Sequence, residues 1–292
     1  MKTLINQFLN YLEVERGLSP RTIKAYNYDL FRFYKFLTSC KKDDIELIHK
    51  QDIRDLLNYL ANHENFEVSR ARQLSAIKSF FKYLVKEDII KVNPAIDIES
   101  PKIPQKEPSF LSEEEYNRLL TTIKKVATPY YKKRDIAIVS LFLSAGLRLS
   151  ELVNLKLEDV DLKQNSIKIK RKGNKEQIIP LNTEISEILK QYLNSRPKIE
   201  NDSFFISKRE NGISARSVYH LVKKYLKKAG INKRKVGVHS LRHTFCTALL
   251  NKGVNLIVIQ QLAGHRNLET TRKYLHLNNI DLRNAVNQIS FK

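Results

Sequence analysis

The sequence contains few of the residues that build disulfide-bonded or metal-bound domains. Of its 292 residues only two are cysteines, Cys40 and Cys246. They form no CxxC pair, so neither a disulfide framework nor a zinc cluster is indicated. Scarce cysteine without a disulfide pattern is typical of a reducing compartment, and we expect a cytoplasmic protein.

Long apolar segments and nucleotide-binding loops are also missing. The longest apolar run, from Ile136 to Leu147, is too short to cross a bilayer. The amino terminus, MKTLINQFLNYLEVER, is amphipathic and lacks the apolar core and cleavage site of a signal peptide. No GxxxxGK[ST] loop occurs, which excludes a P-loop ATP site. We therefore expect neither a membrane partner nor ATP as a cofactor.

Negative charge is scarce relative to positive charge. The chain has 52 Lys and Arg against 31 Asp and Glu, a formal net charge of +21. Residues 1–108 carry a net charge of +3 and residues 109–292 a net charge of +18. A field of this strength attracts polyanions. Nucleic acid is favoured over an anionic membrane surface, because no segment resembles an interfacial helix; a merely lysine-rich surface is the plainer alternative.

The first hundred residues show the pattern of a helical bundle. Apolar residues recur at helical spacing in four segments, at about 2–15, 20–37, 50–63 and 69–85. Ser19-Pro20 is a strong start signal, with serine as N-cap and proline at the first helical position. Four amphipathic helices with short connections predict a small bundle over residues 1–100. The segment SPKIPQKEPSF follows, and its three prolines predict an extended linker over residues 101–108.

The remaining residues, 109–292, predict a second, mostly α domain with a small antiparallel sheet. Ser112 to Glu115 form a capping box, and a helix at about 131–144 is apolar on nearly all faces. In the segment SIKIKRKGNKEQIIPL, a hairpin with a Gly173-Asn174 turn is predicted from alternating residues, namely Ile167, Ile169 and Ile178. Further helices are expected at about 183–194, 214–229, 240–251, 255–262, 267–274 and 280–288.

Several separated residues in this domain are candidates for chemistry. They are Arg148, Lys172, His239, Arg242, His265 and Tyr274. Each alone has an ordinary explanation: Arg148 as a surface arginine beside a turn, Lys172 as a solvated hairpin tip, and Tyr274 as one of 13 tyrosines. His239 and Arg242 are three residues apart, so they share a face of a predicted helix.

A zinc site is disfavoured at the histidine pair in the same helix. His239 and His243 are four residues apart, as in a zinc-binding helix. The residue after His239 is Ser240 rather than the glutamate of HExxH, and no third ligand is evident. We therefore expect no metal and interpret His243 as structural.

Taken together and in this order, the candidates resemble the tyrosine recombinase and integrase family. The resemblance includes the SPRTIKAY start of the first domain and covers essentially the whole chain, and it is strongest to the Xer-type recombinases. It differs from the family pattern at Ala263, where leucine is usual before Gly-His, and at Leu275, where threonine is frequent after the tyrosine. The resemblance implies a SAM-like core-binding bundle, a catalytic domain and a 3′-phosphotyrosine intermediate.

The chemistry assigns roles to the two arginines and the lysine. Negative charge grows on a phosphodiester as a fifth oxygen approaches phosphorus, and fixed guanidinium groups bind its non-bridging oxygens bidentately. We expect Arg148 and Arg242 to do this in place of a metal ion. Lys172 is the candidate general acid for the leaving 5′-oxygen.

Tyr274 is the expected nucleophile, and two histidines support it. His239 is the candidate proton acceptor or phosphate-side hydrogen-bonding group, and His265 is expected to support the phosphate and orient the site. The division of labour between the two stays open. Candidate residues for binding double-stranded DNA are Arg21, Lys24, Arg70, Arg72, Lys170, Arg171, Lys175, Arg216, Lys223 and Lys224.

The resemblance also implies a tetramer, and three rival functions stay open. In the family the last helix, here near 280–288, docks on a neighbouring subunit of a cyclic homotetramer or heterotetramer; its alternative is packing on its own domain. Rivals are a phage or conjugative-element integrase, a non-catalytic DNA-binding protein with the same fold, and a type IB topoisomerase. The sequence leaves open the target site, the order of strand exchange, a partner recombinase and control by a DNA translocase.

Overall fold

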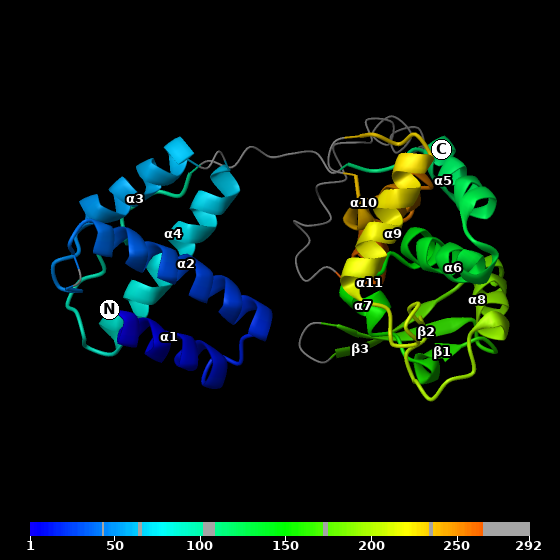
Figure 1. The fold of residues 1–292 in the computed structure, drawn as a ribbon, viewed down its shortest axis with the longest axis horizontal. Helices are drawn as coiled ribbons and strands as arrows, with labels where there is room; N and C mark the ends of the chain where they lie inside the picture. The colour runs from blue at the N-terminus through cyan, green and yellow to red at the C-terminus, as the bar shows by residue number, and fades with distance from the viewer. Residues whose placement is uncertain (43, 64–65, 102–108, 172–174, 234–235, 265–292) are drawn as a thin grey trace, which may run out of the picture. The chain divides into compact units, whose positions relative to one another are not determined.

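The computed structural model describes residues 1–292 except 43, 64–65, 102–108, 172–174, 234–235 and 265–292. The chain divides into two compact units, Met1–Lys106 and Glu107–Lys292 (Figure 1). Within the described residues, no helix is long and apolar enough to cross a membrane. The expected linker lies outside the described residues except for Pro101, and the helices expected at 267–274 and 280–288 lie outside them entirely.

The N-terminal unit is built from helices whose apolar faces meet in one core. They are α1 (Lys2–Val14), α2 (Pro20–Ser39), α3 (Lys50–His63) and α4 (Glu67–Lys86). Ser19 begins α2 as predicted: its hydroxyl accepts a hydrogen bond from the backbone nitrogen of Thr22 at 3.3 Å, and Pro20 stands where no amide donor is required. Burial of aromatic and aliphatic side chains such as Phe33 and Phe80 holds the helices together.

The C-terminal unit surrounds a buried central helix. Its helices are α5 (Glu113–Val126), α6 (Pro129–Ala145), α7 (Leu149–Val153), α8 (Thr183–Ser195), α9 (Ala215–Lys228), α10 (Val238–Asn251) and α11 (Leu256–Ala263). Every residue of α6 from Ala137 to Phe142 is buried, and α6 packs against α5, α8 and α10. The capping box before α5 is confirmed, with Ser112 N to Glu115 Oε2 at 2.8 Å and Glu115 N to Ser112 Oγ at 3.3 Å.

A small antiparallel sheet completes this unit and contains the predicted hairpin. Its strands, in the order β1-β2-β3, are β1 (Val160–Asp161), β2 (Ser166–Arg171) and β3 (Lys175–Pro180). Arg171 pairs with Lys175, so three residues rather than two separate the strands. That register places Ile179 opposite Ile167 on the core face, whereas Ile178 is 68% exposed. Ile178 therefore lies on the face opposite to that of Ile167 and Ile169, because one residue of register exchanges the two faces of a strand.

Candidate active site

Two arginines from separate helices meet at the C-terminal end of α11. Arg148, which precedes α7, donates from Nη2 to the carbonyl oxygen of Gly264 at 2.6 Å. Arg242, in α10, donates from Nη2 to the neighbouring carbonyl of Ala263. The structure thus brings together two of the residues singled out by the sequence, although they are 94 positions apart in the chain. Their guanidinium groups bind adjacent peptide units of one helix end.

The turn after α6 explains how these arginines reach one place. Gly146 ends α6 in the left-handed region, with φ of 59°. A Cβ atom on Gly146 would lie 2.3 Å from the ring of Phe245, so only glycine permits α10 to approach the turn so closely. Arg242, one turn before Phe245, then donates from Nη1 to the carbonyl of Gly146 at 2.6 Å. Arg148 follows Gly146 by two residues, so the turn also sets the position of Arg148.

Glu151 lies between the arginines and was missed by the sequence analysis. It is 7% exposed, and its Oε1 accepts from Arg148 Nη1 at 2.6 Å while its Oε2 accepts from the backbone nitrogen of Arg148 at 2.7 Å. Arg242 Nη1 is 4.0 Å from Oε2. The overlooked signal was local: a glutamate three residues after the residue that begins a helix is the pattern recognised at Glu115.

Arg171, a predicted DNA contact, is the third arginine of the cluster. It ends β2, its side chain is only 9% exposed, and its Nη2 donates to the carbonyl of Leu262 at 2.8 Å. Its Nη1 is 3.7 Å from Oε1 of Glu151. The pKa of Arg171 is lowered to about 10, chiefly by burial; the positive charges of Arg148 and Arg242 contribute to the lowering, and Glu151 opposes it.

The charge balance of this cluster suits an anionic ligand. Three guanidinium groups face one carboxylate, and the side chains of Arg171 and Arg242 are more than nine-tenths buried. The C-terminal carbonyls of α11 add partial negative charge, but no full one. Arg148 is the most accessible of the three, with 35% of its side chain exposed. A phosphodiester at this edge would supply the missing negative charge and accept hydrogen bonds from fixed donors.

The remaining catalytic candidates flank this cluster in the sequence. His239 lies in the first turn of α10, is exposed, and precedes Arg242 by three residues, so both share a helix face. Lys172, His265 and Tyr274 lie outside the described residues. Lys172 directly follows Arg171, and His265 directly follows Gly264, whose carbonyl binds Arg148. Two of these three candidates therefore adjoin residues of the cluster through a single peptide bond.

The DNA-binding candidates of the N-terminal unit lie on α2 and α4. Arg21 and Lys24 are exposed on α2. Arg21 and Arg72 line a hollow of about 360 Å³ between these helices. Arg72 also forms an ion pair with the buried carboxylate of Asp29, at 2.9 Å from Nη2 to Oδ1. Arg70 is partly buried, and its Nε has no hydrogen-bond partner within the described part of the chain.

The candidates of the C-terminal unit occupy different surroundings. Lys170 on β2, and Arg216 and Lys224 on α9, are exposed. Lys223 is exposed too, but its Nζ donates to the carbonyl of Val236 at 2.7 Å. The side chain of Lys175 lies outside what the structure describes. Exposed basic residues such as these suit phosphate contacts, which give salt-dependent affinity without sequence choice.

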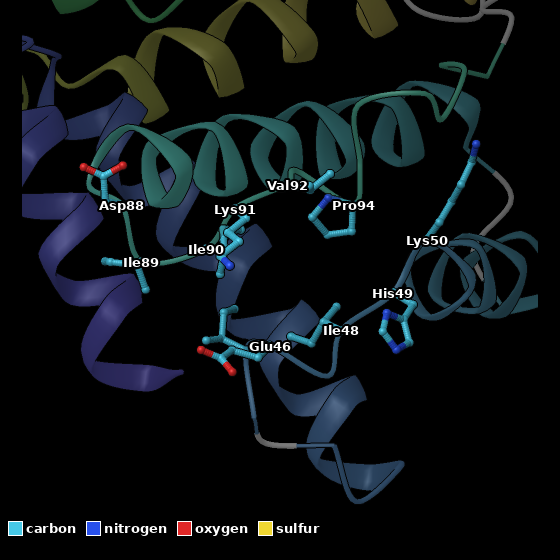
Figure 2. Close-up of a pocket in the computed structure, with 11 residues that line it drawn as sticks. Glu46, Ile48, His49, Lys50, Asp88, Ile89, Ile90, Lys91, Val92 and Pro94 are labelled. Carbon is cyan, nitrogen blue, oxygen red and sulfur yellow. The ribbon is translucent and has the colours of Figure 1, made fainter.

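A second hollow of the N-terminal unit has a different chemical character. It measures about 630 Å³ and is lined by residues between Ile45 and Lys50, which lead into α3, and by the segment after α4 (Figure 2). Its charged lining has both signs, with Glu46 and Asp88 beside Lys50 and Lys91. This mixture does not select a phosphate. Among the described residues, no group of three or more His, Cys, Asp or Glu is placed to hold a metal ion.

Comparison with known proteins gives one consistent result along the chain. The model of the phage integrase family matches residues 109–280, and that of the phage integrase N-terminal SAM-like domain matches residues 5–88. The tyrosine recombinase XerC of Caldanaerobacter subterraneus subsp. tengcongensis is 38% identical over 309 residues, covering 98% of this chain and 86% of that protein. The tyrosine recombinase XerD of Listeria innocua is 35% identical over 295 residues, covering 99% and 98%.

A solved structure shows the same fold. The XerH site-specific recombinase, in a post-cleavage complex with its palindromic difH substrate, matches with a TM-score of 0.80. The match covers 97% of this chain and 84% of that one, at 24% sequence identity. At this identity the likeness concerns the fold, and it extends over the helical N-terminal part as well as the part that holds the arginine cluster.

Proposed function

The chain belongs to the phage integrase family of tyrosine recombinases, and we propose that it cleaves and rejoins DNA at a specific site through a 3′-phosphotyrosine on Tyr274. Similarity to XerC and XerD proteins over nearly the whole chain makes resolution of chromosome or plasmid dimers in the cytoplasm the proposed task. The observation that supports the chemistry is the convergence of Arg148 and Arg242 on the end of α11, beside Glu151.

In the proposed cleavage step, the phenol oxygen of Tyr274 attacks the scissile phosphorus. A bond forms between that oxygen and phosphorus, and the bond from phosphorus to the 5′-oxygen breaks. Arg148 and Arg242 bind the non-bridging oxygens, whose negative charge increases on the way to the transition state. Because their guanidinium groups are already held by Glu151 and by backbone carbonyls, little reorganisation is needed when the charge develops.

Two protons move in this step. The phenol of Tyr274, with an ordinary pKa of about 10, must lose its proton, and His239 is the proposed acceptor. Lys172 is the proposed donor to the leaving 5′-oxygen, which would otherwise depart as an alkoxide. His265 is proposed to support the phosphate. Reversal of the step by a 5′-hydroxyl rejoins DNA, so the energy of the phosphodiester is retained and neither ATP nor a metal ion is required.

Affinity for DNA is proposed to come from both units. The exposed side chains of Arg21 and Lys24 on α2, and of Lys170, Arg216 and Lys224, supply positive charge for phosphate contacts. Segment 280–288 is proposed to dock on a neighbouring subunit of a tetramer on DNA, through apolar residues such as Ile280 and Val286. Removing residues 280–292 should then leave DNA binding by the monomer intact and abolish the tetrameric complex in sedimentation experiments.

A nicked suicide substrate tests the proposed chemistry directly. Cleavage next to the nick releases a short strand, which prevents rejoining and traps protein on DNA. The wild-type chain should form a covalent adduct in EDTA without ATP, visible on a denaturing gel. Tyr274→Phe should bind the same DNA in a mobility shift and give no adduct, because it lacks the attacking oxygen. Tyr130→Phe is the matched control, because Tyr130 is 65% exposed on α6. This variant should form the adduct at the wild-type rate.

The alternatives give different results in the same assay. A non-catalytic DNA-binding protein would give no adduct with the wild-type chain on any substrate. A type IB topoisomerase would form adducts and relax plasmids without regard to sequence. Adduct formation that depends on one repeat sequence among several supports the site-specific recombinase.

A further inference from the structure

The β2–β3 hairpin is fastened to the C-terminal end of α11 by two side chains. Arg171 on β2 donates from Nη2 to Leu262 O at 2.8 Å and from Nη1 to Ala263 O. Gln177 on β3 donates to Gln261 O at 2.9 Å. Three successive carbonyls at the end of α11 are therefore bound by side chains of the β2–β3 hairpin, which lies next to α7 and α11 in Figure 1.

The register explains why these two side chains reach the same helix. Ile169 is buried on the core face of β2 and is paired with Gln177. Arg171 follows Ile169 by two residues and so lies on the same face. The apolar face of the hairpin thus ends in two polar side chains, which meet the C-terminal carbonyls of α11. The carbonyls in the last turn of a helix have few intrahelical donors, and they accept side-chain donors well.

Burial of the Arg171 guanidinium group near two other arginines costs free energy, so stability alone does not explain an arginine at this position. Its Nε is buried without a hydrogen-bond partner within the described part of the chain, and it lies close enough to Arg148 and Arg242 for their charges to lower its pKa. A buried charge that faces like charges is costly, and apolar residues of similar size often replace such groups without loss of stability. The arrangement is better explained by a geometric task.

We propose that Arg171 is a positioning residue for the cleavage reaction, which fixes the turn end of the hairpin strands on the helix end that also binds Arg148 and Arg242. This inference rests on the proposed function. Lys172 is the next residue in the sequence and is joined to Arg171 by one peptide bond. A general acid must come within hydrogen-bond distance of the leaving oxygen, and anchoring the preceding residue restricts where its side chain can reach.

Gly264 leaves the space that the Arg171 guanidinium group needs at the end of α11. It ends α11 in the left-handed region, and a Cβ atom there would lie 1.8 Å from Nη1 of Arg171. The absence of a side chain therefore leaves the space that the Arg171 guanidinium occupies. The same glycine carries the carbonyl that binds Arg148 and precedes His265 in the chain.

Two substitutions at Arg171 distinguish the effect of its hydrogen-bonding geometry from the effect of its charge. Arg171→Lys keeps the positive charge, but an ammonium group cannot match the planar fork that spans two carbonyls. Arg171→Gln removes both. If position matters, both variants should lose activity, the lysine variant less. Lys168→Gln is the matched control, because Lys168 lies on the outer face of the same strand and the change removes one positive charge without touching α11.

The test compares two suicide substrates that differ in one bridging atom. In the first, the leaving group is the ordinary 5′-oxygen, which needs a proton. In the second, sulfur replaces that oxygen, so the phosphorus–sulfur bond breaks and a 5′-thiolate leaves without protonation. Arg171→Gln and Lys172→Ala should each slow adduct formation on the oxygen substrate by about 10²-fold or more, and on the sulfur substrate both should react within about threefold of the wild-type chain.

Each outcome decides the question. An Arg171→Gln variant that cleaves the oxygen substrate at the wild-type rate overturns the proposal. Equal losses on both substrates also overturn it, because Arg171 would then act on the phosphate or the tyrosine rather than through Lys172. If Arg171→Gln unfolds, Arg171→Lys is tested instead, by the ratio of its rates of adduct formation on the oxygen and sulfur substrates. A wild-type chain that forms no adduct on either substrate refutes the proposed function itself.

Discussion

Both units of this chain bury a carboxylate beside arginine, but only one of them buries the arginines as well. In the N-terminal unit Asp29 is 1% exposed, while 54% of the side chain of its partner Arg72 is exposed to water. In the C-terminal unit Glu151 is 7% exposed and two of its three arginines are more than nine-tenths buried. Water can solvate the first arginine, whereas the second group of charges requires another anion.

This contrast distinguishes an ion pair that links two helices from a cluster with excess positive charge, which we propose as the phosphate-binding site. The Asp29–Arg72 pair links α2 to α4, and its charges nearly balance. The Glu151 cluster joins residues from α7, β2 and α10 to the end of α11 and retains an excess of positive charge. The same kinds of side chain therefore serve different purposes, and the number of arginines and their access to water decide which.

The largest expected difference between the two sites is in reaction rate. Arg242→Ala should slow adduct formation on saturating substrate by about 10²–10³-fold, because one preorganised donor to the phosphate is lost. Arg72→Ala should instead raise the DNA concentration needed for half-maximal adduct and change the saturated rate little. Single-turnover rates over a range of DNA concentrations measure both effects. A lower saturated rate for Arg72→Ala would break the comparison.

The next largest expected difference is in stability. Glu151→Gln leaves three guanidinium groups without a counter-charge and should lower the free energy of unfolding by about 3 kcal/mol. Asp29→Asn should cost about 1 kcal/mol or less, because Arg72 can turn to water. Urea unfolding followed by circular dichroism measures both, since the chain has no tryptophan to serve as a fluorescent probe.

Sulfate provides the control for the stability comparison. The anion should restore part of the stability of Glu151→Gln by occupying the arginine cluster, and it should do much less for Asp29→Asn. Equal stabilisation of both variants by sulfate would mean that the ion acts generally rather than at the cluster, and the charge argument would then lose its support.

How far the sequence predicts this molecule depends on the range of the signal. The helices of the bundle and the capping box at Ser112 were predicted because their signals span one or more full turns. Glu151 was missed because α7 has only five residues, too few for an apolar period to appear. Which of Ile178 and Ile179 faces the core depends on the length of the connection between the strands, and alternation along a single strand does not determine that length.

The arginine cluster shows a second limit. Arg148 and Arg242 were singled out from the resemblance, and their proximity is a property of the tertiary fold that no local pattern contains. Arg171 had a usable signal, since Ile167, Ile169 and Arg171 alternate along one strand face. A basic residue in a lysine-rich hairpin nevertheless suggested a phosphate contact, because charged residues are seldom buried.

A smaller effect concerns the pH dependence of two buried carboxyls within the N-terminal unit. Burial raises the pKa of Asp29, and Arg72 only partly offsets this. Burial would also raise the pKa of Asp52, but hydrogen bonds from Lys42 and from the backbone of His49 outweigh it and lower that pKa. A raised carboxyl pKa makes the folded state bind more protons, so its contribution to stability falls as pH rises; a lowered one does the opposite.

Two variants therefore should show opposite slopes with pH. Asp29→Asn should be relatively less destabilising at pH 7 than near pH 4, because the wild-type carboxylate is disfavoured once ionised. Asp52→Asn should be more destabilising at pH 7 than near pH 3, where the wild-type carboxyl begins to protonate. Urea unfolding between pH 3 and pH 7 tests this, and slopes of the same sign would contradict it.

The smallest expected effect is the clearest test of whether Arg171 touches DNA. An exposed arginine that binds a phosphate releases counterions, and Arg21→Ala should therefore reduce the slope of log affinity against log salt by about 0.9. Arg171→Gln removes the same charge, yet its side chain is 9% exposed and is bound to the end of α11, so the slope should stay near that of the wild-type chain. Binding titrations of the uncleaved duplex at several salt concentrations measure both slopes. If Arg171→Gln reduced the slope as much as Arg21→Ala, Arg171 would leave α11 to bind phosphate, and the separation of a buried positioning arginine from an exposed binding one would fail.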